Sequence, residues 1–104
     1  MNSQFKKGVL DIVVLSLLSD KDMYGYEIAT DISVSVNISE GTVYPLLRRL
    51  GSDGLLDSYL EESGKGPPRK YYKLTDKGRC YLEKNRTLWF EFVDKVNEIL
   101  RRNQ

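Results

Sequence analysis

One stretch of the chain decides the fold: Ser39-Glu40-Gly41-Thr42-Val43-Tyr44-Pro45-Leu46-Leu47-Arg48-Arg49-Leu50. Its apolar side chains recur at i, i+3, i+4 and i+7, which is the spacing of one buried helix face, and the helix should end near Gly54. These side chains are Val43, Leu46, Leu47 and Leu50. The opposite face mixes small, hydroxyl and guanidinium groups, which is the surface that a helix in the major groove of DNA needs.

The polar face of this predicted helix is our candidate DNA-contacting surface. Arg48 can pair with O6 and N7 of guanine, Thr42 can meet a thymine methyl group or a phosphate, and Gly41 lets the backbone approach DNA closely. The candidates on this helix are Ser39, Gly41, Thr42, Tyr44, Pro45, Arg48 and Arg49. A second interpretation stays open, because two arginines on an exposed face can simply be solvated.

Pro45 disturbs this helix if Ser39 is the N-cap, because the proline then lies at the sixth helical position. Either Thr42 is the true cap or the first turn is distorted. In both cases the first turn would present free N–H groups and hydroxyls towards a phosphate. Pro45 could equally do no more than fix the start of the helix.

The residues before this stretch predict two further helices. Apolar side chains at helical spacing indicate a helix over 7–18 and another over 24–36, although the end of the second, Ser33-Val34-Ser35-Val36, could equally be extended. Lys6 and Lys7 precede the first helix and could add contacts to phosphates.

The residues after it predict a hairpin with a basic tip. Two tyrosine- and leucine-bearing strands, 55–62 and 70–74, are separated by SGKGPPR, whose glycines and prolines suit a turn. Four cations and no acid lie between Gly64 and Leu74, as expected of a loop that follows a DNA backbone or enters a minor groove. The candidate contacts are Lys65, Gly66, Arg69 and Lys70. A solvated charge run is the open alternative.

The last part of the chain predicts one long helix with a wide apolar stripe. Thr75 followed by Asp76 is typical of a helix start, and no proline interrupts the chain before Arg102. The stripe consists of Leu82, Trp89, Phe92, Val93, Val96, Ile99 and Leu100. Because it is wider than one small domain can cover, we expect it to pack on the same helix of a second copy. The alternative is that it closes only its own core.

The composition excludes several classes of protein. At 104 residues the chain can bury one modest core, and the fold class is mainly α with a small two-stranded wing. No apolar run approaches a bilayer span, so we expect a soluble, cytoplasmic protein. Without histidine and with Cys80 as its single thiol, the chain lacks the usual parts of a catalytic centre, a zinc site or a disulfide. We therefore expect no enzyme, no metal and no cofactor, and interpret Cys80 as structural.

Several motifs follow one another in a defined order. They are Tyr24-Gly25-Tyr26-Glu27-Ile28, the stretch from Ser39 to Leu50, Gly54-Leu55-Leu56, and Arg69-Lys70-Tyr71-Tyr72-Lys73-Leu74-Thr75-Asp76-Lys77-Gly78. Each is weak alone, but their order and spacing are specific. Over nearly its whole length the chain resembles the PadR family of bacterial transcriptional regulators.

The resemblance implies a winged helix-turn-helix fold with its third helix in the major groove. Residues 1–76 would be the DNA-binding domain and 77–104 the dimerisation helix, as one structural unit. By position, the resemblance places Thr42, Tyr44, Pro45 and Arg48 on the recognition helix, and Lys65, Gly66, Arg69 and Lys70 on the wing. The chain departs from its relatives at Gly66-Pro67-Pro68-Arg69, where a glycine is often followed directly by arginines. The two prolines offer no N–H to a phosphate.

The single C-terminal helix resembles the short, LmrR-like subfamily, whose members bind flat aromatic compounds between two subunits. This implies a homodimer that represses transcription from a pseudo-palindromic operator in double-stranded DNA, and a planar aromatic effector stacked on Trp89 or Phe90. Aromatic side chains at helical spacing can also be core residues. The rival function is a winged-helix protein-interaction module without sequence-specific DNA binding, since the net charge is only +1.

Overall fold

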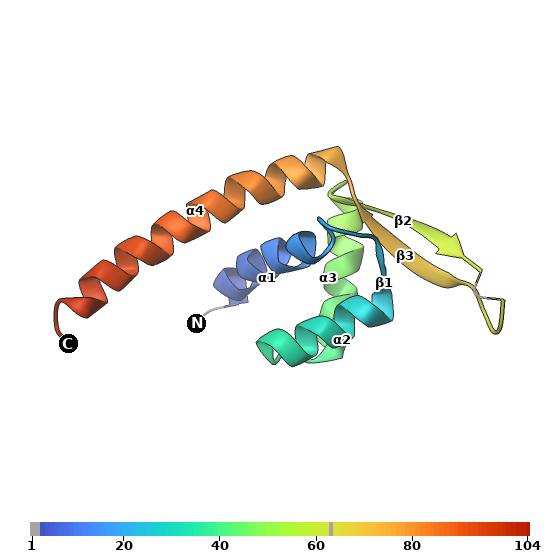
Figure 1. Ribbon diagram of the computed structural model, residues 1–104, viewed down its shortest axis with the longest axis horizontal. Coiled ribbons are helices and arrows are strands. Elements are labelled where there is room, and N and C mark those ends of the chain that lie inside the picture. The colour runs from blue at the N-terminus through green and yellow to red at the C-terminus, as the bar shows by residue number, and fades with distance from the viewer. Residues whose placement is uncertain (1–2, 63) are drawn as a thin grey trace.

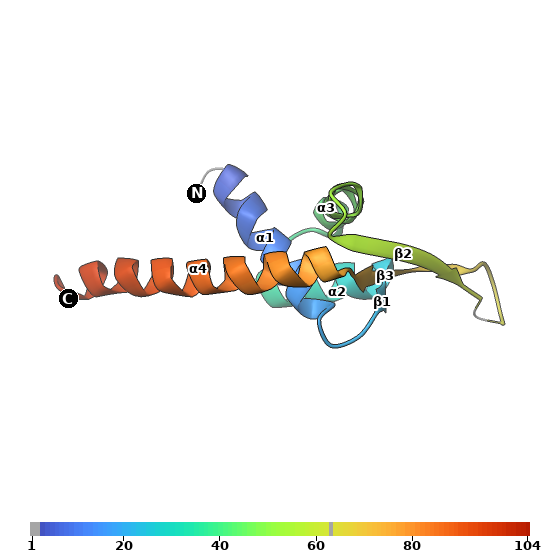
Figure 2. The ribbon, with the colours of Figure 1, turned by 90° about the horizontal axis from the view of Figure 1, so that it is seen from above.

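The computed structural model describes residues 3–62 and 64–104, with side chains from residue 8 onward. Along this part of the chain the elements are α1 (Ser3–Leu17), β1 (Met23–Tyr24), α2 (Gly25–Val36), α3 (Glu40–Ser52), β2 (Leu56–Glu61), β3 (Arg69–Leu74) and α4 (Asp76–Arg101), as Figure 1 shows. The second half of α4 and the β2–β3 hairpin extend to opposite ends of the molecule, which measures 58 × 27 × 22 Å (Figures 1 and 2). The mainly α fold with a small β-wing is confirmed.

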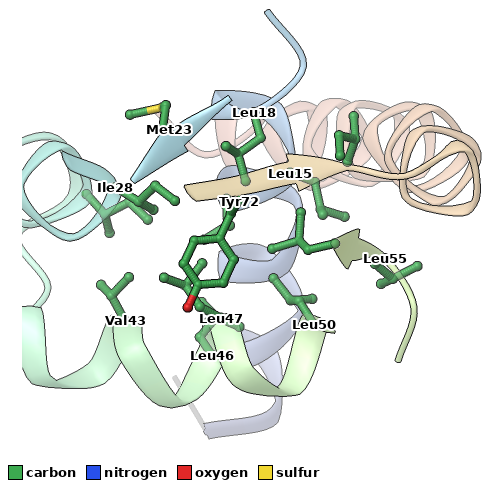
Figure 3. Packing of buried hydrophobic residues seen from close by; sticks show 14 of the residues in the cluster. Leu15, Leu18, Met23, Ile28, Val43, Leu46, Leu47, Leu50, Leu55 and Tyr72 are labelled. Carbon is green, nitrogen blue, oxygen red and sulfur yellow. The ribbon is translucent and has the colours of Figure 1, made fainter. Parts of the chain in front are cut away.

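The core lies where α1, α2 and α3 meet the sheet. The predicted apolar face of α3 is buried there, with Val43, Leu47 and Leu50 almost fully enclosed. Figure 3 shows these side chains pointing towards Leu15 of α1 and the Tyr72 ring of β3. Burial of this face follows directly from its spacing, because positions three and four apart lie on one side of a helix.

The ends of α3 explain its position in the chain. Ser39 is the N-cap, and the Thr42 N–H donates to the Ser39 carbonyl at 3.0 Å, so the first turn is tightened and Pro45 lies inside the helix. At the other end, Gly54 has φ +78, its N–H bonds to the Gly51 carbonyl, and the Leu55 N–H bonds to the Leu50 carbonyl. These two bonds form the left-handed C-terminal cap that a glycine at this place predicts.

The sheet has one strand that the sequence did not reveal. Among the described residues β1 pairs with β3 through Met23–Tyr72 and Tyr24–Tyr71, giving the antiparallel order β1-β3-β2. The expected two-stranded wing is therefore the extension of a three-stranded sheet. A strand of two residues is too short to produce a periodic pattern, and its partner lies far along the chain.

Helix α4 begins on the body of the protein and then leaves it. The Thr75 hydroxyl accepts from the Gly78 N–H at 2.9 Å, which confirms the predicted N-cap. Along α4 only Gly78 and Leu82 are buried. The helix packs beside α1, and its C-terminal part continues beyond α1 (Figure 1).

Candidate nucleic-acid interface

Most of the polar face of α3 is exposed to solvent. Gly41, Thr42, Tyr44, Pro45 and Arg48 are all exposed. The hydroxyls of Ser39 and Thr42 lie 2.8 Å apart at the start of the helix, beside its first free N–H groups. The structure therefore brings these six candidates together on one surface, with hydroxyls at one end and a guanidinium further along.

Arg49 differs from the other candidates on α3. Its guanidinium donates two hydrogen bonds to the carboxylate of Asp11 in α1 and lies 3.7 Å from the carboxylate of Asp53. Asp11 is 5% exposed, so this ion pair holds α3 against α1 at the edge of the core. The hydrogen bond to Asp11 raises the pKa of Arg49 above its ordinary value. The guanidinium is thus already held by the chain, and its contact with DNA stays a prediction.

The ion pair makes a prediction about stability. Arg49→Met should lower the free energy of unfolding by about 3 kcal/mol, because it leaves the Asp11 carboxylate buried without its partner. Arg48→Met on the neighbouring, exposed residue should change it by less than about 0.5 kcal/mol. Urea unfolding followed by circular dichroism measures both, and equal effects of the two substitutions would contradict the role given to Asp11.

The wing cations lie on two different faces. Because side chains alternate along a strand, Lys70 shares its face with Tyr72 and Ser58, while Arg69 lies on the opposite one. The Lys70 ammonium is 5.5 Å from the centre of the Tyr72 ring, and the Arg69 guanidinium is 4.8 Å from the centre of the Tyr24 ring. At the tip, Gly66 has φ +88. The side chains of Lys6 and Lys7 lie outside the described residues.

The outer face of the wing carries a row of tyrosines that sequence reasoning missed. The Tyr71 ring lies 5.7 Å from those of Tyr24 and Tyr59, counted between ring centres. The Tyr59 hydroxyl donates to Asp22 at 2.7 Å, and this bond raises the pKa of Tyr59 to about 12. The row connects the hairpin to the start of α2 and so fixes the wing relative to the body. The available signal was a charged residue two positions to either side of both Tyr59 and Tyr71, which a strand places on the same face as the tyrosine.

A polar hollow separates α3 from the wing. It measures about 530 Å³ and lies between the C-terminal half of α3 and the first half of the hairpin. The lining residues are Leu47, Arg48, Gly51, Ser52, Leu56, Asp57, Ser58, Lys70 and Tyr72. Figure 3 shows the ring of Tyr72, one of the lining residues, beside Leu46 and Leu47 of α3.

A second, largely apolar hollow of about 300 Å³ lies between α1 and α4. Its lining residues are Gly8, Val9, Ile12, Tyr81, Asn85, Leu88, Trp89 and Phe92. Of the two candidate ligand residues, Trp89 lines it, whereas Phe90 does not and is 58% exposed. The two therefore do not form one site within the chain.

The residues predicted for the dimer interface divide into two groups. Leu82 is 2% exposed because it packs in the core of its own chain. Further along α4, the side chains of Phe92, Val96, Ile99 and Leu100 are exposed, and those of Trp89 and Val93 are partly buried.

Comparison with known proteins identifies this arrangement. The model of the transcriptional regulator PadR-like family matches residues 14–84, which include α2, α3, the hairpin and the start of α4. The chain belongs to this family. The family predicted from the motifs is therefore confirmed. PadR-like proteins are transcriptional regulators and not enzymes, which also confirms the expectation of no catalytic activity.

Solved and curated relatives cover most of this PadR-like chain. A PadR-like transcriptional regulator from Bacillus cereus is 40% identical, with a TM-score of 0.82 over 94% of this chain and 97% of that one. A transcriptional regulator of Mycobacterium tuberculosis is 30% identical over 94 residues, which are 89% of this chain and 87% of that protein. PadR of Bacillus subtilis, whose crystal structure is a complex with operator DNA, is 26% identical over 73% of this chain and 45% of its own, with a TM-score of 0.66.

The structure also bears on membrane association. In residues 3–62 and 64–104 of this PadR-like chain, every helix is too short or too polar to cross a bilayer.

Proposed function

We propose that this PadR-like regulator binds a pseudo-palindromic operator in double-stranded DNA as a homodimer and represses transcription in the cytoplasm. Residues 1–76 would hold the DNA and 77–104 would join the two copies. The observation that carries the proposal is the exposed polar face of α3, which has hydroxyls at its N-terminal turn and Arg48 further along, with a basic wing beside it. The crystal structure of the related Bacillus subtilis PadR with operator DNA supports it.

Salt dependence tests this proposal. A protein that neutralises several phosphates loses affinity steeply between about 50 and 200 mM salt, because bound counterions are released. We expect such a slope for a duplex from the protein's own promoter, and we expect specific binding to survive an excess of random competitor DNA. Binding that is weak and insensitive to salt would instead favour the protein-interaction module.

One arginine substitution and one lysine substitution distinguish base recognition from phosphate contact. Arg48→Ala should weaken binding to the operator about tenfold or more while changing binding to random DNA little, because a bidentate contact to guanine is lost. Lys65→Ala should weaken both kinds of DNA to a similar extent. Fluorescence anisotropy on both duplexes measures the ratio. Equal losses on the two duplexes for Arg48→Ala would mean that this residue only touches phosphate.

The dimer proposed here uses the exposed half of α4. The side chains of Phe92, Val96, Ile99 and Leu100 form an exposed apolar face along the second half of α4, and Phe92 also lies at the hollow beside α1. Exposed apolar faces of this kind usually mark an interface. An isologous pairing of two such helices would give the twofold symmetry that a pseudo-palindromic operator requires. Leu82 is left out of this interface because it is buried within its own chain.

A planar aromatic effector of the LmrR-like type would fit the hollow between α1 and α4. Trp89 lines that hollow and could stack on a flat ring, while Phe90 would contribute only from outside it. Because Trp89 is the single tryptophan, its fluorescence should be quenched by planar cationic or phenolic compounds at micromolar concentration. Trp89→Leu should weaken binding of the same compounds, as measured by calorimetry. Unchanged emission across such a panel would count against an effector at this place.

A further inference from the structure

We propose that the polar hollow between α3 and the wing holds one backbone phosphate of the DNA duplex, and that Lys70, Ser58 and Ser52 bind it. This inference rests on the proposed function, because it names the part of the DNA that this surface receives. It adds two serines that are not among the predicted DNA contacts, and it separates Lys70 from the other wing cations.

The walls of the hollow come from two elements that would meet DNA in different grooves under the proposed function. Leu47, Gly51 and Ser52 line it from α3, and Ser58 and Lys70 line it from the wing. When a recognition helix lies in the major groove and a wing reaches the adjacent minor groove, the sugar-phosphate strand between the two grooves passes between them. A hollow in this place therefore faces a phosphate rather than a base edge.

The Lys70 side chain is turned towards the hollow. Its ammonium lies 5.5 Å from the centre of the Tyr72 ring, two residues nearer to the body along β3. Tyr72 is 8% exposed and packs beside α3 (Figure 3). A cation held over an aromatic face is restrained in position, so the charge stays at the hollow instead of following the mobile end of a long side chain.

The donors that line the hollow match a phosphate diester. The ammonium of Lys70 and the hydroxyls of Ser52 and Ser58 can all donate hydrogen bonds to anionic oxygens. Arg48 lines the same hollow and adds positive charge, although we expect its guanidinium to reach base edges. Asp57 is also a lining residue, but strand alternation puts its side chain on the other face, across from Lys73.

Lys70→Gln and Lys73→Gln form a matched pair for the test. Both remove one charge from β3, but from opposite faces of the hairpin. The probe is a duplex selected from a random pool by the wild-type protein, with binding followed by fluorescence anisotropy. Lys70→Gln should weaken binding about tenfold or more and lower the slope of log K against log salt by about two, one for each copy in the dimer, whereas Lys73→Gln should stay within about twofold. Equal losses for the two variants would overturn the proposal.

A second measurement locates the phosphate. Replacing single phosphates of the selected duplex with neutral methylphosphonates should reveal one linkage per half-site whose neutralisation weakens the wild type but costs Lys70→Gln nothing further. Ser58→Val keeps a residue type that favours strands but removes the hydroxyl. This variant should bind DNA more weakly, and neutralising the same linkage should cost it less affinity than it costs the wild type. A scan in which every linkage costs both proteins equally would overturn the inference while leaving DNA binding intact. If the wild type selected no duplex, the proposed function itself would fail.

Discussion

The protein carrying Val96→Glu together with Ile99→Glu should be a monomer at micromolar concentration and should bind its operator about a thousandfold more weakly than the wild type. Both side chains lie on the exposed apolar face of α4, at 36% and 57% exposure. Two carboxylates on each copy would face each other in a twofold interface, where they lose water and repel. Loss of the dimer lowers operator affinity. In the dimer, once one copy is bound, the other copy meets the second half-site at an effective concentration in the millimolar range.

Light scattering after size exclusion measures the mass, and anisotropy measures the affinity. Thr87→Glu is the matched control, because Thr87 is nine residues before Val96 and so lies on the opposite side of α4. It adds a carboxylate to the same exposed helix and should leave both mass and affinity unchanged. If the double variant remained dimeric, the proposal that α4 forms the dimer interface would be wrong.

The second large effect is expected at Gly78, where α4 starts against the loop between α3 and β2. A Cβ at this position would lie 2.1 Å from the carbonyl oxygen of Leu55 and 2.8 Å from a methyl carbon of Leu74. The backbone carbonyl cannot move aside cheaply, since it also accepts from the Thr75 N–H at 3.2 Å. Gly78→Ala should therefore lower stability by about 3 kcal/mol and the melting temperature by more than about 10 °C.

Gly41→Ala is the control for stability. Gly41 has no atom within 4 Å of a Cβ, so alanine there should keep or slightly raise the melting temperature, as expected for a helical position. The same variant should weaken DNA binding if the backbone of α3 approaches the duplex at this point. If the Gly78→Ala protein had the same melting temperature as the wild type, α4 would be able to shift away from Leu55 at little cost in free energy.

Much of the candidate site was predictable because its signals are local. The spacing of Val43, Leu46, Leu47 and Leu50 fixes which face of α3 is buried, and thereby which face carries Thr42, Tyr44 and Arg48. The glycine at 54 and the threonine at 75 mark helix ends through bonds to residues three to five positions away. Helical geometry and capping depend on neighbours in the chain, so the sequence states them directly.

The parts that sequence reasoning missed depend on residues far apart in the chain. Arg48 and Arg49 are the same residue type and are neighbours in the sequence. Only the fold brings Asp11, which lies 38 positions before Arg49, into contact with Arg49. In the same way, the row of Tyr24, Tyr71 and Tyr59 requires the pairing of β1 with β3. No local pattern encodes such pairings, because they arise when separate elements pack on a shared core.

The sequence by itself therefore determined the family, the order of the helices and the hairpin, and the polar face of α3, because these follow from periodicity, caps and motif spacing. Only the tertiary structure decided that Leu82 belongs to the core while Phe92 faces solvent, and that Lys70 faces α3 while Arg69 faces away from it. The reason is physical: a stripe on a helix or a run on a strand gives the direction of each side chain, but what that side chain meets depends on where the neighbouring elements pack.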